Sequence, residues 1–206
     1  MSELKQIKSA LISVYHKDGL NDILKVLNDN GVQLISTGGT REFIESLGYK
    51  CQAVEDITTY PSILGGRVKT LHPKIFGGIL CRRELDADLK QAEQYEIKPI
   101  DLVIVDLYPF EDTVASGASE ADIIEKIDIG GISLIRAAAK NFNDVAIVSS
   151  REQYLPFLSL IQESEAKTTR PQRRKLAQEA FQRTKDYDKA IWKYFSGDEE
   201  EKTLYY

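Results

Sequence analysis

Short apolar segments alternate with amphipathic ones along most of this chain. Runs that are apolar or rich in β-branched residues predict strands at residues 7–14, 32–35, 49–54, 75–80, 101–107 and 145–149. Segments with apolar residues three and four positions apart predict helices at residues 20–27, 37–47, 84–95, 119–127, 131–140 and 151–162. The segment 101–107 is apolar on both faces, as a strand inside a parallel sheet requires. The alternation predicts an α/β fold with a doubly wound, mostly parallel sheet.

The C-terminal part has a different pattern. Residues 163–169 are polar and predict a linker, and Pro171 fits the first turn of a long helix that ends near Phe195. Apolar residues form a stripe along this helix, which we expect to pack on the domain or on a partner subunit: Leu176, Ala180, Phe181, Tyr187, Ile191 and Tyr194. The acidic residues 197–206 predict a frayed end or a linker. We therefore expect an α/β domain at 1–162 and a linker with a helical extension at 163–206.

Composition narrows the class of protein. The chain has 206 residues, 42% hydrophobic and 29% charged, which suits one domain with its own core. A net charge of -5 argues against a general nucleic-acid binder. Apolar runs are too short to span a membrane, and residues 1–11 lack a signal-peptide pattern. We expect a cytoplasmic protein with neither a nucleic-acid nor a membrane partner.

Cysteine and histidine are too sparse for a metal or disulfide framework. Cys51 and Cys81 lie in apolar contexts and are expected to be buried, unreactive thiols. His16 and His72 are far apart and have no Cys partners at ligand spacing, so no metal site is predicted.

The stretch Gly65-Gly-Arg-Val-Lys-Thr-Leu-His-Pro73 carries the strongest functional signal. Two glycines allow the backbone to approach a ligand closely, and Pro73 fixes the exit of the loop. Arg67 and Lys69 are two positions apart, so an extended segment would point both cations to one side, where an anion can bind. By itself, this spacing also fits a solvated basic turn.

Other motifs each have a structural alternative. Ser36-Thr37-Gly38-Gly39-Thr40 lies between a strand and a helix, where free amides form a phosphate seat or simply a cap. Ser13 and Lys17 also lie near a strand end, where ligands gather in doubly wound folds. The remaining candidates are Tyr108 in Leu-Tyr-Pro-Phe, Asp128 in Ile-Asp-Ile-Gly-Gly and Lys140 in Arg-Ala-Ala-Ala-Lys-Asn. Their structural alternatives are a half-buried aromatic, a helix cap and a partner of the helix dipole.

Taken together and in this order, the motifs closely resemble the inosine monophosphate (IMP) cyclohydrolase domain, the N-terminal half of a bifunctional enzyme of purine biosynthesis. The resemblance runs from about residue 8 to about residue 195 and implies a methylglyoxal synthase-like fold. It also implies ring closure of the formamido-imidazole-carboxamide ribonucleotide to IMP and water, a hydrolase-class reaction on a cyclic amidine that needs no cofactor or metal. The family associates in pairs, so a homodimer is expected.

The resemblance also implies roles for individual residues. The catalytic positions that match the family are Lys69, Tyr108, Asp128 and Lys140, the last two as a pair that handles protons. The matching substrate-binding positions are Ser13, Lys17, Thr37, Gly38, Gly39, Thr40, Arg67, Thr70, Asp106, Gly130 and Gly131.

Two departures from the family pattern concern the predicted site. The family commonly reads Val-Ser-Asp-Lys where this chain has Val14-Tyr15-His16-Lys17, so a bulky ring replaces a small hydroxyl. It also often has Asn before Leu-Tyr-Pro-Phe, where this chain has Asp106. An ionised carboxylate accepts hydrogen bonds but cannot donate them, so this side of the site is expected to differ.

Two other functions remain open at this point. A methylglyoxal synthase-like lyase would need a carboxylate base with a histidine near the phosphate. A nucleotide-sensing regulatory domain would keep the phosphate seat without needing Lys69, Asp128 and Lys140 together. The Arg-Tyr-Gly-x-Asn-Pro-His-Gln motif typical of the transformylase half is not in this sequence, so we expect no transformylase activity and a separate or missing second half.

Overall fold

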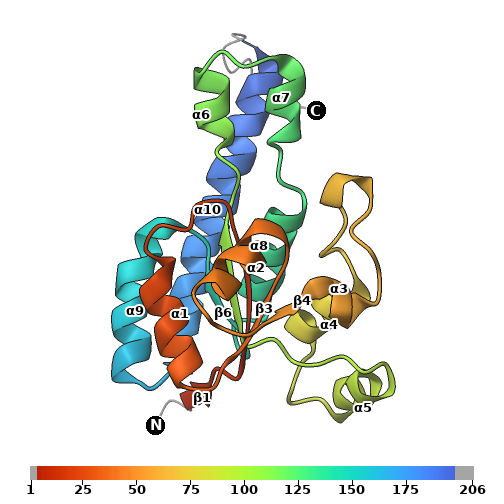
Figure 1. Cartoon of the computed structure of the whole chain (residues 1–206), viewed down its shortest axis with the longest axis vertical. Helices are drawn as coiled ribbons and strands as arrows, with labels where there is room; N and C mark the ends of the chain where they lie inside the picture. The colour runs from red at the N-terminus through yellow and green to blue at the C-terminus, as the bar shows by residue number, and fades with distance from the viewer. Residues whose placement is uncertain (1–3, 198–206) are drawn as a thin grey trace, which may run out of the picture.

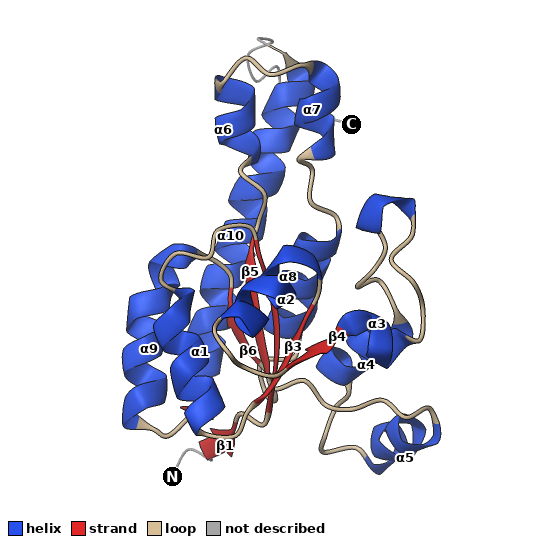
Figure 2. Cartoon of the chain, viewed as in Figure 1, coloured by secondary structure: helices blue, strands red, loops and turns tan. Residues whose placement is uncertain are grey.

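A computed structural model describes residues 4–197 of the chain. Its centre is a five-stranded parallel sheet with strand order β4-β3-β2-β5-β6 (Figure 2). The strands are β2 (Ser9–Val14), β3 (Gln33–Ser36), β4 (Cys51–Ala53), β5 (Leu102–Asp106) and β6 (Ala146–Val148). Because β3 and β4 follow β2 to one side while β5 and β6 lie on its other side, the chain reverses direction between β2 and β5. The predicted doubly wound α/β fold is confirmed.

Helices cover the two faces of the sheet. Helices α1 (Leu20–Asp29) and α2 (Gly38–Ser46) lie in the crossovers from β2 to β3 and from β3 to β4, whereas α8 (Gly130–Lys140) lies in the connection from β5 to β6. The two sets of crossovers run toward opposite edges of the sheet, so right-handed connections place α1 and α2 on one face and α8 on the other. Helix α9 (Tyr154–Glu163) packs beside α1, and the long helix α10 (Arg170–Ser196) packs on α8 and β6 (Figure 1). The carboxyl ends of all five parallel strands consequently meet at one edge.

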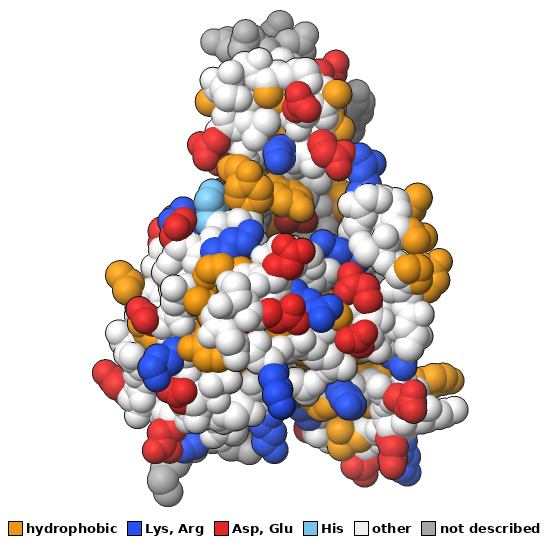
Figure 3. Space-filling view, viewed as in Figure 1, with side chains coloured by type: hydrophobic (Ala, Val, Ile, Leu, Met, Phe, Trp, Pro, Cys, Tyr) orange, Lys and Arg blue, Asp and Glu red, His pale blue; other side chains and the backbone are white. Residues whose placement is uncertain are grey.

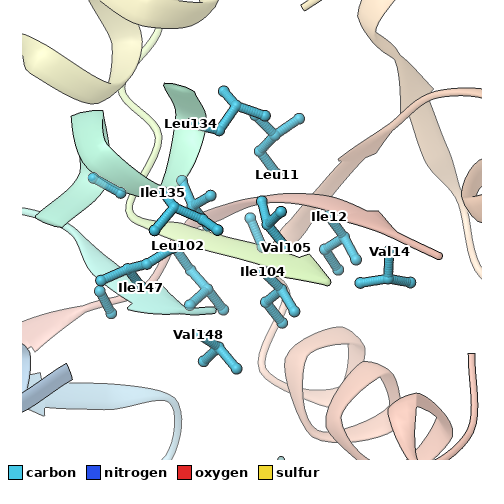
Figure 4. Close-up of a cluster of buried hydrophobic side chains, with 14 of the residues drawn as sticks. Leu11, Ile12, Val14, Leu102, Ile104, Val105, Leu134, Ile135, Ile147 and Val148 are labelled. Carbon is cyan, nitrogen blue, oxygen red and sulfur yellow. The ribbon is translucent and has the colours of Figure 1, made fainter. Parts of the chain in front are cut away.

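The core lies on both faces of the sheet. Successive side chains of a strand alternate between faces, so Leu11 and Val105 point toward α8, whereas Ile12 and Ile104 point to the opposite face (Figure 4). All four are at most 1% exposed, so the middle of β2 and of β5 is buried on both faces of the sheet.

The predicted strand at residues 75–80 is wrong, because this segment is the helix α4 (Pro73–Leu80). Ile75 and Ile79 are four positions apart and both buried, so the short apolar run also fits one face of a helix. Pro73 stands in the first turn, and His72 Nδ1 accepts the Lys74 backbone N–H as an N-cap.

The polar linker predicted at 163–169 contains a strand, β7 (Lys167–Thr169), which pairs antiparallel with β1 (Leu4–Gln6). The shorter elements, of which α5 and α7 lie within predicted helices, are α3 (Val54–Thr58), η1 (Leu64–Gly66), α5 (Asp86–Gln94), α6 (Phe110–Ala115), α7 (Glu120–Glu125) and η2 (Arg151–Gln153). In Figure 1, α6, α7 and the end of α10 form a projection above the sheet.

Helix α10 is fixed to the α/β domain by a buried arginine. The Arg173 guanidinium donates to the backbone oxygens of Phe142, Thr168 and Asn143, so that its charge is satisfied although the residue is only 1% exposed. Part of the predicted stripe packs on the domain: Leu176, Ala180 and Tyr187 are buried, whereas Phe181 is 42% exposed. The acidic tail predicted at 197–206 lies, from residue 198 on, outside the described residues.

Both cysteines are half-buried rather than buried. Burial raises the pKa of the Cys51 thiol to about 11 and also raises the pKa of Cys81. Within the described part of the chain, no helix is long and apolar enough to cross a membrane.

Candidate active site

A cavity of about 590 Å³ opens at the carboxyl edge of the sheet, where the strand order reverses between β2 and β5. In an open parallel sheet this switch point is the usual position of a ligand site. The cavity is lined by residues that follow β2, β3 and β5, by the loop at 65–70, and by the segment that joins α7 to α8.

Most of the predicted site residues line this cavity. They are Ser13, Lys17, Thr37, Gly39, Thr40, Arg67, Lys69, Thr70, Asp106, Tyr108, Asp128, Gly130 and Gly131. Gly38 and Lys140 are not among the lining residues. Segments that are spread along the chain from residue 13 to residue 131 therefore line one cavity. No single motif was sufficient to predict this.

The N-terminus of α2 faces the cavity with its first amides free of a side-chain cap. Thr37 is extended, and Gly38 has φ +52°, a left-handed conformation that favours glycine. The Lys69 Nζ lies 3.4 Å from the point that a Cβ on Gly38 would occupy, so a cation stands at this helix terminus. Free amides, the helix dipole and a cation together form a site for an anion.

The two threonine hydroxyls of this junction have other partners. Thr40 Oγ1 donates to the Val14 carbonyl at 3.0 Å and accepts the Val14 amide at 3.2 Å, which ties α2 to the end of β2. Thr37 Oγ1 donates to the Glu55 carboxylate at 3.0 Å. In this structure both hydroxyls act as structural ties.

The N-terminus of α8 brings Asp128 into the cavity. Its Oδ1 accepts the Gly131 amide at 2.6 Å, and its own amide donates to Tyr187 Oη at 2.8 Å. A Cβ on residue 131 would lie 2.4 Å from Asp128 Oδ2, so only glycine leaves room for the carboxylate. Burial raises the pKa of Asp128 above its ordinary value, against opposing effects from the Gly131 amide, Lys69 and the Tyr108 amide.

Tyr108 and Lys69 belong to the same cluster as Asp128. The pKa of the Tyr108 phenol is raised by burial and further by the charges of Asp128 and Glu125. Lys69 is close enough to lower the pKa of Asp128. A carboxylate with a raised pKa, a phenol and an ammonium group can thus reach one ligand, which is the equipment for acid–base chemistry and charge stabilisation.

Arg67 and Thr70 connect the 65–70 loop to the opposite side of the cavity. Arg67 pairs with Glu125, which raises the pKa of the Arg67 guanidinium and lowers that of Glu125. Thr70 Oγ1 lies 3.1 Å from the point that a Cβ on Gly130 would occupy, so Gly130 allows the loop to approach α8.

Lys140 lies at the exposed C-terminal end of α8. At 1.5 Å per residue, the rise from Gly130 to Lys140 is about 15 Å. The structure therefore separates Lys140 from Asp128 within one chain, and the predicted proton-handling role of Lys140 stays a prediction.

Tyr15, Glu125 and the hydrophobic residues of the 124–129 segment also line the cavity, although none of the motifs placed them in the site. For Tyr15, the large side chain at a position where the family commonly has serine was the feature of the sequence that could have indicated a place in the cavity. In Figure 3 a group of hydrophobic side chains lies between the α6–α7 projection and the sheet, with basic side chains beside it. Among the described residues, no three His, Cys, Asp or Glu side chains gather so as to hold a metal ion.

Comparison with known proteins agrees with this architecture. Residues 19–133, more than half of the chain, match the model of the MGS-like domain. The chain belongs to the MGS-like domain family. Residues 138–205 match the model of the AICARFT/IMPCHase bienzyme, so the two matches together confirm the family resemblance drawn from the motifs.

Similar proteins include the bifunctional purine biosynthesis protein PurH of Bacteroides thetaiotaomicron, which is 68% identical over 199 residues, covering 97% of this chain and 39% of that protein. PurH of Rhodopirellula baltica is 51% identical over 96% of this chain and 38% of its own length. This MGS-like chain thus spans less than two fifths of these curated relatives. A crystal structure of ForH superposes with a TM-score of 0.77 and 31% identity, covering 93% of this chain and all of that one.

Proposed function

We propose that this MGS-like chain is an IMP cyclohydrolase, which closes the purine ring of the 5-formamidoimidazole-4-carboxamide ribonucleotide in the last step of de novo purine biosynthesis. The observation that carries the proposal is the meeting of Lys69, Tyr108 and Asp128 in a cavity at the switch point of the sheet. The names of the PurH relatives and the AICARFT/IMPCHase match support the same assignment.

The proposed reaction joins two groups of one molecule. The carboxamide nitrogen attacks the formyl carbon, a C–N bond forms, and the formyl oxygen becomes a hydroxyl group. The carboxamide nitrogen and the formamido nitrogen each lose one proton, the C–O bond breaks, and the oxygen leaves with both protons as water. Since nucleophile and electrophile are already connected, the enzyme has mainly to orient them, stabilise charge and move protons.

Each of the three residues suits one of these tasks. Asp128 accepts the carboxamide proton, because its raised pKa brings it closer to that of an effective base at neutral pH. Lys69 stabilises the negative charge that develops on the formyl oxygen. Tyr108, whose phenol keeps its proton because its pKa is raised, donates a hydrogen bond to the same groups.

The phosphate of the substrate would bind at the N-terminus of α2. The free amides after Thr37 and the positive end of the α2 dipole favour a dianion there. Lys17 and Ser13 line the same cavity at the end of β2. This orientation leaves the Asp128 end of the cavity for the base.

The positions of the two histidines favour this proposal over the lyase alternative. His16 Nδ1 lies 2.8 Å from Asp106 Oδ2, and His72 Nδ1 accepts the Lys74 amide, so each ring has a partner of its own. Neither histidine lines the large cavity. A histidine placed beside a bound phosphate, which the lyase would need, is therefore missing from the described residues.

A spectrophotometric assay tests the proposal. Purified protein is mixed with the formylated ribonucleotide, without folate, and formation of IMP is compared with the rate without enzyme. We expect catalysed IMP formation that Lys69→Met reduces by at least about 100-fold, the range for a lost electrostatic contact of this kind. A wild-type rate equal to the enzyme-free rate would reject the cyclohydrolase assignment and leave the nucleotide-sensing domain, which predicts binding of IMP without turnover.

A further inference from the structure

The two departures from the family pattern meet in the structure. Asp106, at the end of β5, is 8% exposed and its Oδ2 lies 2.8 Å from both the backbone nitrogen and the ring Nδ1 of His16. The parallel register sets Asp106 beside Val14 at the end of β2, so the loop after β2 must pass over this carboxylate. Asp106, predicted to bind substrate, thus directs its carboxylate to His16.

His16 in turn supports an aromatic corner at the cavity. The His16 ring meets the Tyr15 ring edge-on with centroids 4.8 Å apart, and the Tyr15 ring meets the Tyr108 ring edge-on at 5.5 Å and 87°. Lys126 Nζ lies 5.3 Å from the centroid of the Tyr15 ring and 5.5 Å from that of Tyr108, within range of a cation–π contact with both. Tyr15 and Tyr108 both line the large cavity and are 39% and 40% exposed.

The same residues separate two cavities. A second cavity of about 190 Å³ is lined by His16, Asp106 and Tyr108, while Tyr15, Asp106 and Tyr108 line the large one. His16 therefore stands behind the aromatic corner, on the side away from the proposed substrate. Without the imidazole, the Tyr15 ring would lose its support and could turn toward the smaller cavity.

We propose that His16, held by Asp106, is a positioning residue that fixes Tyr15 against Tyr108 and so shapes the base-binding end of the cavity. Two perpendicular rings form a corner in which a flat heterocycle can stack on one ring and meet the edge of the other. In this proposal the Tyr15 ring contacts the base of the substrate, and His16 acts only by holding that ring in place. The inference rests on the proposed ring closure, because it concerns the placement of the Tyr108 phenol in that reaction.

The pairing predicts that the two departures compensate each other. An aspartate at position 16 would place a second carboxylate against the buried Asp106, and two like charges at that distance repel each other. An asparagine at position 106 removes this repulsion and can donate to an aspartate. We therefore expect an aspartate at position 16 to impair the protein less when asparagine stands at position 106.

A mutant cycle tests the positioning role, with kcat and KM measured for IMP formation. His16→Ala is expected to lower kcat by roughly 10- to 100-fold, the effect of misplacing a reacting group by about 1 Å, with a smaller change in KM. The double variant Tyr15→Ser/His16→Ala is expected to be no slower than Tyr15→Ser alone, since His16 acts through Tyr15. Asp18→Asn, in the same loop and outside both cavity linings, is the matched control and is expected to keep wild-type kcat.

A charge exchange separates positioning from folding. His16→Asp is expected to lower kcat at least as much as His16→Ala, and Asp106→Asn added to it is expected to restore most of the loss. Any of three results would overturn the proposal. They are a wild-type kcat in His16→Ala, losses that multiply when His16→Ala is combined with Tyr15→Ser, and no recovery of kcat in His16→Asp/Asp106→Asn. An inactive wild-type protein would instead reject the ring-closing function and this inference with it, so the two failures are told apart in one series.

Discussion

Asp128 offers the sharpest separation of catalysis from stability in this protein. Its Oδ1 caps the Gly131 amide at 2.6 Å, and its carboxylate is held in the cavity with a raised pKa. Asp128→Asn keeps an oxygen for the amide but cannot accept a proton as a base. We expect turnover to fall by about 10²- to 10⁴-fold, the range for lost acid–base catalysis.

The stability of the protein should respond differently to Asp128→Ala and to Asp128→Asn. Asp128→Ala also removes the cap, which costs about 0.5–2 kcal/mol. For a chain of this size each kcal/mol corresponds to roughly 2–4 °C in Tm, so Asp128→Ala is expected to melt several degrees lower and Asp128→Asn to stay near wild type. Ser119→Ala is the matched control, because Ser119 accepts the Asp122 amide as the N-cap of α7 outside the cavity lining. It should lose stability and keep its turnover.

The pH dependence has a definite sign. Because the pKa of Asp128 is raised in the folded protein, kcat/KM should rise with pH through a pKa above 3.8, and Asp128→Asn should lack this rise. Wild-type protein should also lose stability relative to Asp128→Asn as pH increases from the ordinary to the raised pKa, since the folded state binds the extra proton in that window. Near-wild-type turnover in Asp128→Asn across this range would refute the assignment of Asp128 as the base and leave it as a helix cap.

Four further outcomes are expected. Gly131→Ala should reduce turnover about tenfold or more and lower Tm by several degrees, as Asp128→Ala does, because its Cβ displaces the carboxylate that caps the helix; kinetics and calorimetry check both. Thr40→Val should destabilise the fold by about 1–3 kcal/mol in urea titrations, since it leaves two Val14 backbone groups unpaired. Lys140→Met, combined with Asp128→Asn, should give losses that add, because the two groups are apart; a double variant no slower than one single variant would show that they act together. Light scattering should report a dimer, and a monomer at high concentration would contradict it.

Patterning predicted the sheet because each central strand is buried on both faces. Leu102–Asp106 is apolar up to its last residue and Ser9–Val14 is mostly apolar, and polar residues at and after their ends mark the carboxyl edge. The same reasoning failed at Pro73–Leu80, where an apolar run of this length fits a strand or one face of a helix. The pairing of Leu4–Gln6 with Lys167–Thr169 could not be predicted from an apolar pattern, because both strands are short and mostly polar and each forms only with a partner far along the chain.

The site was predictable only as far as local sequence determines position. Lys69, Tyr108 and Asp128 each lie in a short segment after a strand or before a helix, so the topology brings them to one edge. Side-chain partners across long separations were not predictable. The Thr40 hydroxyl binds Val14 and the Asp106 carboxylate binds His16, and both interactions arise only when the ends of separate segments are packed together.

A crystal structure of the protein with IMP tests the central claim most directly. We predict the nucleotide in the cavity between β2 and β5, with its phosphate at the N-terminus of α2 and its base within hydrogen-bond distance of Lys69, Tyr108 or Asp128. The base should lie against the corner formed by the Tyr15 and Tyr108 rings. A nucleotide bound outside this cavity, or one with its phosphate beside Asp128, would contradict the account.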